Sequence, residues 1–371
     1  MAGSLLPLAG LKVVAIEQAV AAPFASSRLA DAGAEVIKIE RPEGDFARGY
    51  DDVAKGQSSY FVWLNRGKTS VTLDLASDAG KAELARLLDG ADVLIQNLKR
   101  GALAKLGFGF DRLARDWPRL ITCSITGYGE DGPMADRKAY DLLIQAESGL
   151  CSITGGPESP ARVGISIVDT ATGQTAYAAI LEALIRRGVT GKGANISVSM
   201  FDVMADWMTV PLLNHEGGKT PKRIGLAHVS IAPYGVFTAK DGDQILISVQ
   251  SDREWKKLCT DFLGDAALGT DPRFATNVDR VANRSDTDAT VAAGFARMTG
   301  EEAIAALLKA DVALATVSDM QKLSSHPHLR RITVNTPNGP VSFPAPAPIF
   351  EGESRAYGAV PALNPVEEKT P

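Results

Sequence analysis

The stretch LKVVAIEQAVAAPFASSRLADAGAEVIKI, Leu11 to Ile39, decides the fold of this chain. Its apolar runs Leu11–Ile16 and Ala34–Ile39 have the composition of buried strands, and the residues between them, Pro23–Ala32, have that of a helix. Proline in the first turn and Gly33 just past the end are typical helix boundaries. Because two strands joined by a helix usually run parallel, the stretch predicts a β-α-β unit of a parallel sheet.

The same alternation continues through the first half of the chain. It predicts strands at Thr69–Leu75, Ala91–Asn97, Pro118–Thr126 and Ala194–Ser199, a helix at Ala79–Leu88 and an apolar helix at Met200–Leu213. The fold class is therefore α/β, with a Rossmann-like, doubly wound parallel sheet. In such sheets ligands bind at the carboxyl ends of the strands.

A chain of 371 residues is expected to form about two domains. We predict a large domain at 1–215, a second, smaller α/β domain at 216–328, and a segment at 329–371 that returns to the large domain. Within the smaller domain the pattern indicates a turn at 240–243, a strand at 244–249, and helices near 255–262 and 300–308. The tail from Gly339 is rich in proline and too short for a domain of its own.

The composition, 45% hydrophobic and 22% charged, is that of an ordinary globular protein. The sequence shows neither a membrane-length apolar run nor a signal-peptide pattern, so we expect a cytoplasmic protein without a membrane partner. The net charge of −5 argues against a broad nucleic-acid-binding surface. Cys123, Cys151 and Cys259 lie far apart without a CxxC motif, which argues against a disulfide framework and a metal site.

A second informative stretch is VGISIVDTATGQTAYAAILEALIRR, Val163 to Arg187. The run Val163–Val168 is strand-like and the rest is helical, so Asp169 is expected where a strand gives way to a helix. The positive end of the helix would favour the ionised carboxylate, and Gly173 would let a ligand approach the backbone. The alternative is that Asp169, Thr170 or Thr172 is simply a helix cap.

Basic residues recur after the predicted strand ends. They are Arg41, Lys99, Arg100, Lys105, Arg137 and Lys138. Each alone is typical of a solvated surface charge. Their recurrence at one edge of the sheet points to phosphate recognition.

Six segments together carry a family resemblance. They are ADAGAEVIKIERPEGD (30–45), DVLIQNLKRGALAKLGF (92–108), GYGEDGP (127–133), AYDLLIQAESG (139–149), VDTATG (168–173) and TGKGANISVSMFD (190–202). In order and content they resemble the class III coenzyme A transferases, a family that includes formyl-CoA transferase and the 2-methylacyl-CoA racemases. The likeness spans most of the chain.

The resemblance implies an enzyme that moves coenzyme A (CoA) between an acyl-CoA and a small carboxylic acid. It implies two subunits threaded through each other as an interlocked homodimer, and Asp169 as the catalytic nucleophile. Aspartyl anhydride and aspartyl-CoA thioester intermediates would form in turn. CoA would be substrate and product, with no permanently bound cofactor.

The resemblance also assigns binding residues. The positions that match CoA contacts are Val20, Ala21, Arg41, Leu73, Ala76, Asn97, Leu98, Lys99, Lys105, Lys138, Ala139 and Tyr140. Those that match the acyl pocket or the surroundings of the nucleophile are Tyr50 and Asp141. Gly173 and His228 complete the predicted substrate pocket.

One departure bears on the substrate. Formyl-CoA transferase has a tetraglycine loop where this chain has Ala227–Ile231, and His228 within it is either a packed loop histidine or a ligand for a second carboxylate. The second interpretation predicts dicarboxylates of the succinyl-CoA, mesaconate, malate or citramalate type.

Two alternatives are a racemase and a CoA-binding or nucleotide-binding protein without catalysis. Racemases of the family have a histidine where this chain has Tyr140, and a phenol is a poor base at neutral pH. A pure binder has no need of a carboxylate directed at a polyanion. Both features favour the transferase branch.

Overall fold

A computed structural model describes residues 6–353 and 355–363, which divide into two compact units. Unit 1 comprises the residues up to 151, residues 162–213 and those from 330 onward, and unit 2 comprises Ser152–Ala161 and Asn214–Leu329. The sequence placed 152–161 in the large domain. They group with unit 2 because Arg223 donates to the carbonyls of Ser152, Gly156 and Pro157.

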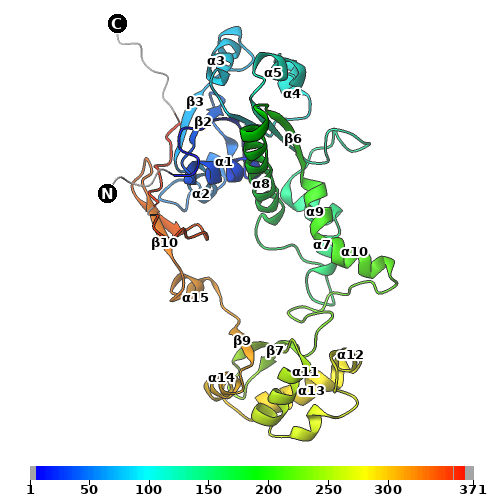
Figure 1. Ribbon diagram of the computed structural model, residues 1–371. Coiled ribbons are helices and arrows are strands. Elements are labelled where there is room, and N and C mark those ends of the chain that lie inside the picture. The colour runs from blue at the N-terminus through cyan, green and yellow to red at the C-terminus, as the bar shows by residue number, and fades with distance from the viewer. Residues whose placement is uncertain (1–5, 354, 364–371) are drawn as a thin grey trace. The chain divides into compact units, whose positions relative to one another are not determined.

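Unit 1 is built on a six-stranded parallel sheet of order β3-β2-β1-β4-β5-β6 (Figure 1). Its strands are β1 Lys12–Ile16, β2 Glu35–Glu40, β3 Lys68–Thr72, β4 Val93–Gln96, β5 Ile121–Thr126 and β6 Ala194–Ser199. This is the Rossmann order, in which the chain reverses direction across the sheet between β1 and β4. The predicted parallel sheet is confirmed.

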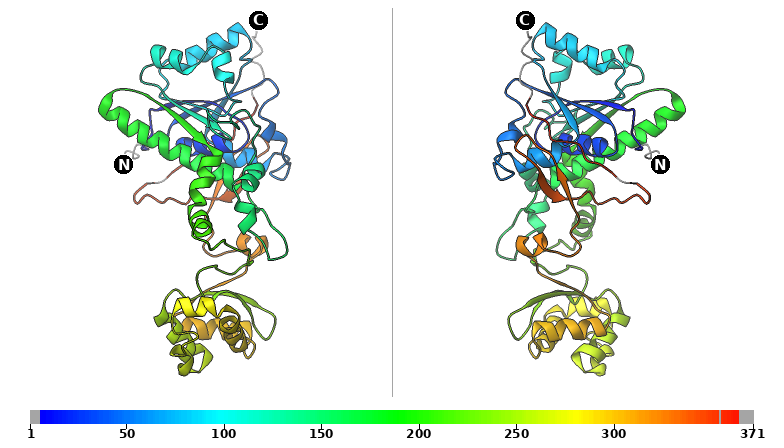
Figure 2. Two further views of the ribbon diagram at one scale, coloured as in Figure 1. Left: turned by 90° about the vertical axis from the view of Figure 1, so that its right-hand side faces the viewer. Right: turned by 90° about the vertical axis from the view of Figure 1, so that its left-hand side faces the viewer.

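Helices cover both faces of the sheet (Figure 2). The helices before β6 are α1 Ala21–Asp31, α2 Ser59–Asn65, α3 Asp78–Leu88, α4 Ala102–Lys105, α5 Phe110–Asp116, α6 Asp141–Glu147, α7 Leu150–Ile153 and α8 Ile167–Thr190, with a 3₁₀ turn at Phe46–Gly49. Helices α1 and α8 pack on one face and α3 to α5 on the other.

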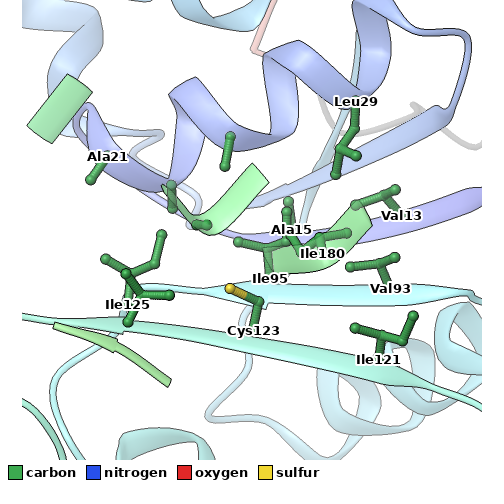
Figure 3. Packing of buried hydrophobic residues seen from close by; sticks show 14 of the residues in the cluster. Val13, Ala15, Ala21, Leu29, Val93, Ile95, Ile121, Cys123, Ile125 and Ile180 are labelled. Carbon is green, nitrogen blue, oxygen red and sulfur yellow. The ribbon is translucent and has the colours of Figure 1, made fainter. Parts of the chain in front are cut away.

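Alternation along the strands explains the two layers. In β1, Val13 and Ala15 join the core under α1 and α8, whereas Val14 and Ile16 join the core under α3 to α5. Figure 3 shows the first of these cores, with Ile180 of α8 against the strands. Strands buried on both faces read as continuous apolar runs, which is why the sequence revealed them.

The predicted strand at Val163–Val168 is wrong. Residues up to Ser166 are irregular, and α8 begins at Ile167. Strand β5 pairs directly with β6, Cys123 opposite Ile196, so no further strand lies between them. The side chain of Gln145 binds the backbone of Val163 and Ile165 instead of a neighbouring strand.

The predicted single helix at Met200–Leu213 is divided into α9 Met200–Trp207 and α10 Thr209–Glu216. Pro211 has no N–H to donate to the carbonyl of Trp207, which ends the first helix there. Proline is tolerated in the first turn of the next one.

Unit 2 contains a three-stranded antiparallel sheet and a helical layer with their own core. The strands are β7 Tyr234–Thr238, β8 Gln244–Ser248 and β9 Ala313–Thr316; the helices are α11 Asp252–Lys257, α12 Asn277–Ala282, α13 Arg284–Phe295, α14 Gly300–Lys309 and α15 Met320–Ser324, with a π turn at Leu258–Leu263 and a 3₁₀ turn at Ala266–Gly269. In unit 1 the C-terminal segment forms a hairpin of β10 Arg331–Val334 and β11 Val341–Pro344. None of the helices in the described residues is long and apolar enough to span a membrane.

Candidate active site

Asp169 lies in the first turn of α8, beside a second carboxylate. Asp141, the first residue of α6, accepts hydrogen bonds from the backbone N–H groups of Val168 (2.8 Å) and Asp169 (3.2 Å). Asp141 is therefore the cap of α8, although it is distant in sequence. The Asp169 carboxylate itself accepts no hydrogen bond from any described residue, so it is available to a ligand.

Burial and the negative charge of Asp141 raise the pKa of Asp169 to about 7. The expectation that the helix end favours the ionised form of this carboxylate is thus wrong. The N–H groups that would stabilise its charge are already occupied by Asp141, so desolvation prevails. A carboxylate that is costly to ionise and has no hydrogen-bond partner is typical of a reactive site.

A cavity of about 650 Å³ opens in front of Asp169. Its walls include residues of the β1–α1 turn, the end of β4, the segment before α6, the start of α8, and the aromatic rings of Phe46, Tyr50 and Tyr60. Burial, together with the charges of Asp45 and Asp169, raises the pKa of Tyr50 to about 12, so its phenol stays protonated and can donate a hydrogen bond. The hydroxyls of Tyr60 and Ser166 lie 3.2 Å apart.

A second cavity, of about 750 Å³, shares Gln18, Leu98 and Lys99 with the first. The cations Arg41, Lys99 and Lys105 border it, and among the described residues none of the three forms an ion pair. Leu73, Leu75 and Leu106 supply apolar surface beside them. A ligand that reaches from one cavity into the other would place an anionic, partly apolar end here and its reactive end near Asp169.

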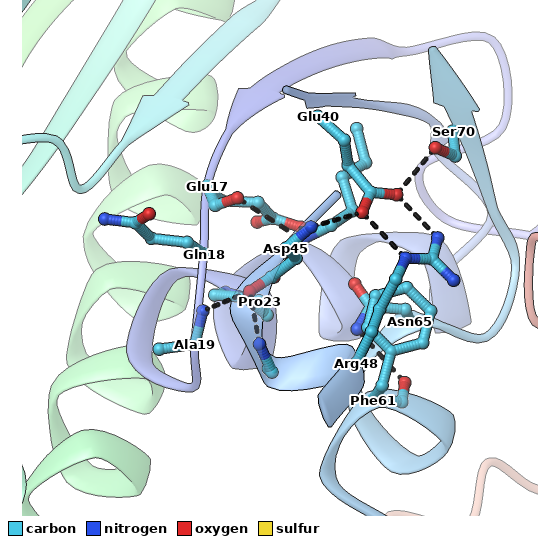
Figure 4. A network of polar contacts seen from close by, with 12 residues as sticks. Glu17, Gln18, Ala19, Pro23, Glu40, Asp45, Arg48, Phe61, Asn65 and Ser70 are labelled. Carbon is cyan, nitrogen blue, oxygen red and sulfur yellow. Dashed lines mark hydrogen bonds and ion pairs between the residues drawn. The ribbon is translucent and has the colours of Figure 1, made fainter. Parts of the chain in front are cut away.

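The turn between β1 and α1 is held rigidly at the junction of the cavities. Ala19 has φ of 63°, an unfavourable conformation for a residue with a side chain. The buried carboxylate of Asp45 holds it by accepting a hydrogen bond from its N–H at 3.1 Å (Figure 4). Lys38 in turn pairs with Asp45 at 2.8 Å. Asn97 completes the support by accepting from the Gln18 N–H and donating to its carbonyl.

The sequence matches the profile of CoA-transferase family III over residues 8–364. The chain belongs to this family. It is 36% identical to an acetyl-CoA:oxalate CoA-transferase of Acetobacter aceti, covering 91% of this chain and 87% of that protein. It is 34% identical to a succinate–glutarate CoA-transferase of Agrobacterium fabrum, covering 94% and 90%. A solved CAIB/BAIF family protein from Brucella suis superposes with a TM-score of 0.81 at 36% identity and 96% coverage of both chains.

Most residues predicted to bind substrates border one of the two cavities of this CoA transferase. The first cavity gathers Val20, Ala21, Tyr50, Asn97, Leu98, Lys99, Lys138, Ala139, Tyr140, Asp141 and Asp169. The second gathers Arg41, Leu73, Ala76, Leu98, Lys99 and Lys105. The structure thus assembles the predicted positions from seven separate stretches of unit 1 into two adjoining cavities.

Gly173 does not serve as a place of close ligand approach, so that interpretation is wrong. A Cβ atom added there would lie 2.5 Å from the Ala21 carbonyl oxygen and 2.8 Å from Cβ of Phe24. The glycine allows α8 to cross α1 closely, which sets the position of Asp169 one turn earlier.

His228 belongs to unit 2, whereas Asp169 belongs to unit 1. Its ring stacks on Tyr234 with centroids 5.2 Å apart, and its Nδ1 accepts from the Ser230 N–H. These contacts fit the packed-loop interpretation. Its assignment to a substrate carboxylate stays a prediction.

Sequence reasoning missed four residues that shape this site: Gln18, Asp45, Tyr60 and Gln145. Asp45 and Gln145 act through hydrogen bonds to distant segments, which leave no local pattern. Gln18 follows a buried strand, so its place at a strand end was the available signal. Its side chain points away from the buried charge network (Figure 4).

Within the described residues there is no group of three or more metal-ligating side chains. Cys123, Cys151 and Cys259 are free thiols.

Proposed function

We propose that this enzyme transfers CoA between an acyl-CoA and a small dicarboxylic acid, with Asp169 as nucleophile. The observation that carries the proposal is the position of the Asp169 carboxylate. It has no hydrogen-bond partner among the described residues, and its cavity adjoins a second one bordered by three cations that form no ion pair with any described residue. CoA carries phosphates at one end and its thioester at the other, which fits this arrangement.

The reaction begins when a carboxylate oxygen of Asp169 attacks the thioester carbonyl. The C–S bond breaks, CoA leaves as the thiolate, and a mixed anhydride remains. The thiolate then attacks the aspartyl carbonyl, which releases the donor acid and forms an aspartyl-CoA thioester. The acceptor carboxylate reverses these two steps, so no net proton or electron is gained or lost.

Each of these steps passes through a tetrahedral oxyanion, which needs positive charge or N–H groups nearby. Val20 and Ala21, at the start of α1, border the same cavity as Asp169. The positive end of α1 therefore faces the reacting atoms. The rigid support of this turn by Asp45 and Asn97 fixes that geometry before substrate binds.

The names of the two relatives support the dicarboxylate part, since oxalate, succinate and glutarate all carry two carboxylates. Tyr140 is exposed at the cavity ahead of Asp141, and the resemblance matches it to a histidine of the racemases. We therefore place the enzyme in the transferase branch. We also propose the interlocked homodimer of the family as its assembly.

The test is a search for the covalent adduct. Incubation with succinyl-CoA, followed by hydroxylamine trapping and peptide mass spectrometry, should show modification of the peptide that contains Asp169. Asp169→Asn should show neither adduct nor turnover, while Asp206→Asn, an exposed aspartate of α9, should behave as wild type. Full transfer activity in Asp169→Asn would contradict the proposal.

A further inference from the structure

The Asp169 cavity contains one cation that neither the CoA assignment nor an ion pair explains. Among its basic residues, Arg100 pairs with Asp136 and Arg137 with Glu147. Lys99 borders the second cavity as well, and Lys138 matches a CoA contact. Arg162 remains, with no ion pair to any described residue.

Arg162 lies on the irregular segment that leads into α8, and that segment is fixed in place. Gln145, fully buried, accepts from the Val163 N–H at 2.9 Å and donates to Asp141 at 2.7 Å. One amide therefore binds both the segment beside Arg162 and the carboxylate that caps α8. This contact couples the position of Arg162 to that of Asp169.

The guanidinium of Arg162 is largely unused. Its described hydrogen bond is a single donation to the Gly164 carbonyl at 3.3 Å, which leaves most of its five N–H donors available. An exposed arginine is often only a solvated surface charge. Here, however, it borders the same cavity as Asp169 and Ser166.

The chemistry of the cavity explains why a cation is needed there. The first carboxylate of a dicarboxylic acid reacts at Asp169, so the second one enters a partly buried space that already contains Asp141. Like charges in a partly desolvated site repel strongly. A guanidinium offsets that repulsion and binds a carboxylate with two parallel hydrogen bonds.

We propose that Arg162 binds the distal carboxylate of the acid substrate and thereby selects dicarboxylates over monocarboxylates. This inference rests on the proposed CoA transfer and names the residue that sets its specificity. It assigns the role predicted for His228 to a residue of unit 1.

The test compares two acceptors of equal chain length, glutarate and pentanoate, with succinyl-CoA as the donor. Because both share the donor half-reaction, the ratio of their kcat/KM values isolates recognition of the distal carboxylate. In Arg162→Gln this ratio should fall by about ten- to a hundredfold, mainly through the KM for glutarate, as expected for a lost charged hydrogen bond. The kcat/KM for pentanoate should change by less than about threefold, because pentanoate has no distal carboxylate to contact Arg162.

Two further variants make the result specific. Arg162→Lys keeps the charge but loses the planar guanidinium. Its ratio of kcat/KM for glutarate to that for pentanoate should therefore lie between those of Arg162→Gln and wild type. Arg186→Gln removes an exposed arginine of α8 that borders neither cavity, and it should match wild type. If Arg162→Gln folds poorly, the ratio is compared between Arg162→Lys and wild type instead.

An unchanged ratio in both Arg162 variants would overturn the assignment, and so would an equal loss for both acceptors. Wild-type preference for pentanoate would overturn it while leaving CoA transfer intact. Absence of CoA transfer to any acid, with no adduct on Asp169, would instead overturn the proposed function and the assignment with it.

Discussion

Asp169 and Asp141 are neighbouring carboxylates with different environments. Asp141 accepts hydrogen bonds from two backbone N–H groups and from the Gln145 amide, so the protein solvates its charge well. The carboxylate of Asp169 accepts no hydrogen bond from the described residues, and the residue is partly buried. Such pairs commonly divide into a structural and a reactive carboxylate. We infer that the reactive one is kept at a cost in stability.

Because of that cost, removal of the charge should increase the free energy of unfolding, by an amount that depends on pH. The pKa of Asp169 is raised from 3.8 to about 7 on folding, so the folded state binds more protons than the unfolded state between these values. Stability therefore falls as pH rises from about 4 to about 7, and the loss persists above that range. Asp169→Asn should raise the free energy of unfolding by about 1–3 kcal/mol at pH 8, allowing for partial solvent screening.

Urea titrations of wild type and Asp169→Asn at several pH values would measure this difference. It should shrink toward zero at pH 4, where wild-type Asp169 is protonated when folded. The control Asp206→Asn should show no such trend. If Asp169→Asn raised the free energy of unfolding equally at pH 4 and pH 8, the effect would not arise from the charge of Asp169.

Among the elements, the crossing of α8 on α1 decides where Asp169 lies. Gly173→Ala would drive a methyl group into the Ala21 carbonyl and Phe24, so the helices must separate. We expect a loss of about 1–3 kcal/mol in the free energy of unfolding, as for other overpacked contacts. Turnover should fall further than stability alone explains, because Asp169 moves relative to the α1 turn.

A matched control exists on the same helix. Gly188 also lies within α8, but a Cβ there would meet no atom within 4 Å. Gly188→Ala should stabilise the protein by about 0.5–1 kcal/mol through helix propensity. Thermal unfolding and steady-state rates of both variants test the prediction. Equal stability and equal turnover in the two variants would show that the α8–α1 crossing does not set the position of Asp169.

The elements that the sequence predicted correctly are those with local signals. Strands buried on both faces are continuous apolar runs, and Pro23 and Gly33 bounded α1 closely. The segment Val163–Ser166 was misread because its apolar residues resemble a strand, while its partner is the Gln145 side chain and not a neighbouring strand. Similarly, the Asp141 cap and the Asp45 support depend on contacts between segments far apart in sequence. Local patterns contain no information about such contacts.

For the molecule as a whole, charge is distributed unevenly. The net charge of −5 would repel a polyanion such as CoA at long range. Arg41, Lys99 and Lys105 nevertheless gather at the second cavity without ion pairs to described residues. We propose that binding of CoA depends on the local field of these three cations, which acts against the overall charge. Such a field is effective within about 10 Å at ordinary ionic strength.

This arrangement predicts that CoA affinity falls as salt is added. Arg41→Gln and Lys105→Gln should each weaken CoA binding about three- to tenfold at low salt, and less at high salt, because charge-assisted contacts to phosphate are lost. Arg253→Gln, an exposed arginine of unit 2, removes the same charge from the molecule and should leave affinity unchanged. Isothermal titration of each variant with CoA at two ionic strengths measures the effect. If Arg253→Gln weakened binding as much as Arg41→Gln, overall charge would govern affinity and the local field would not.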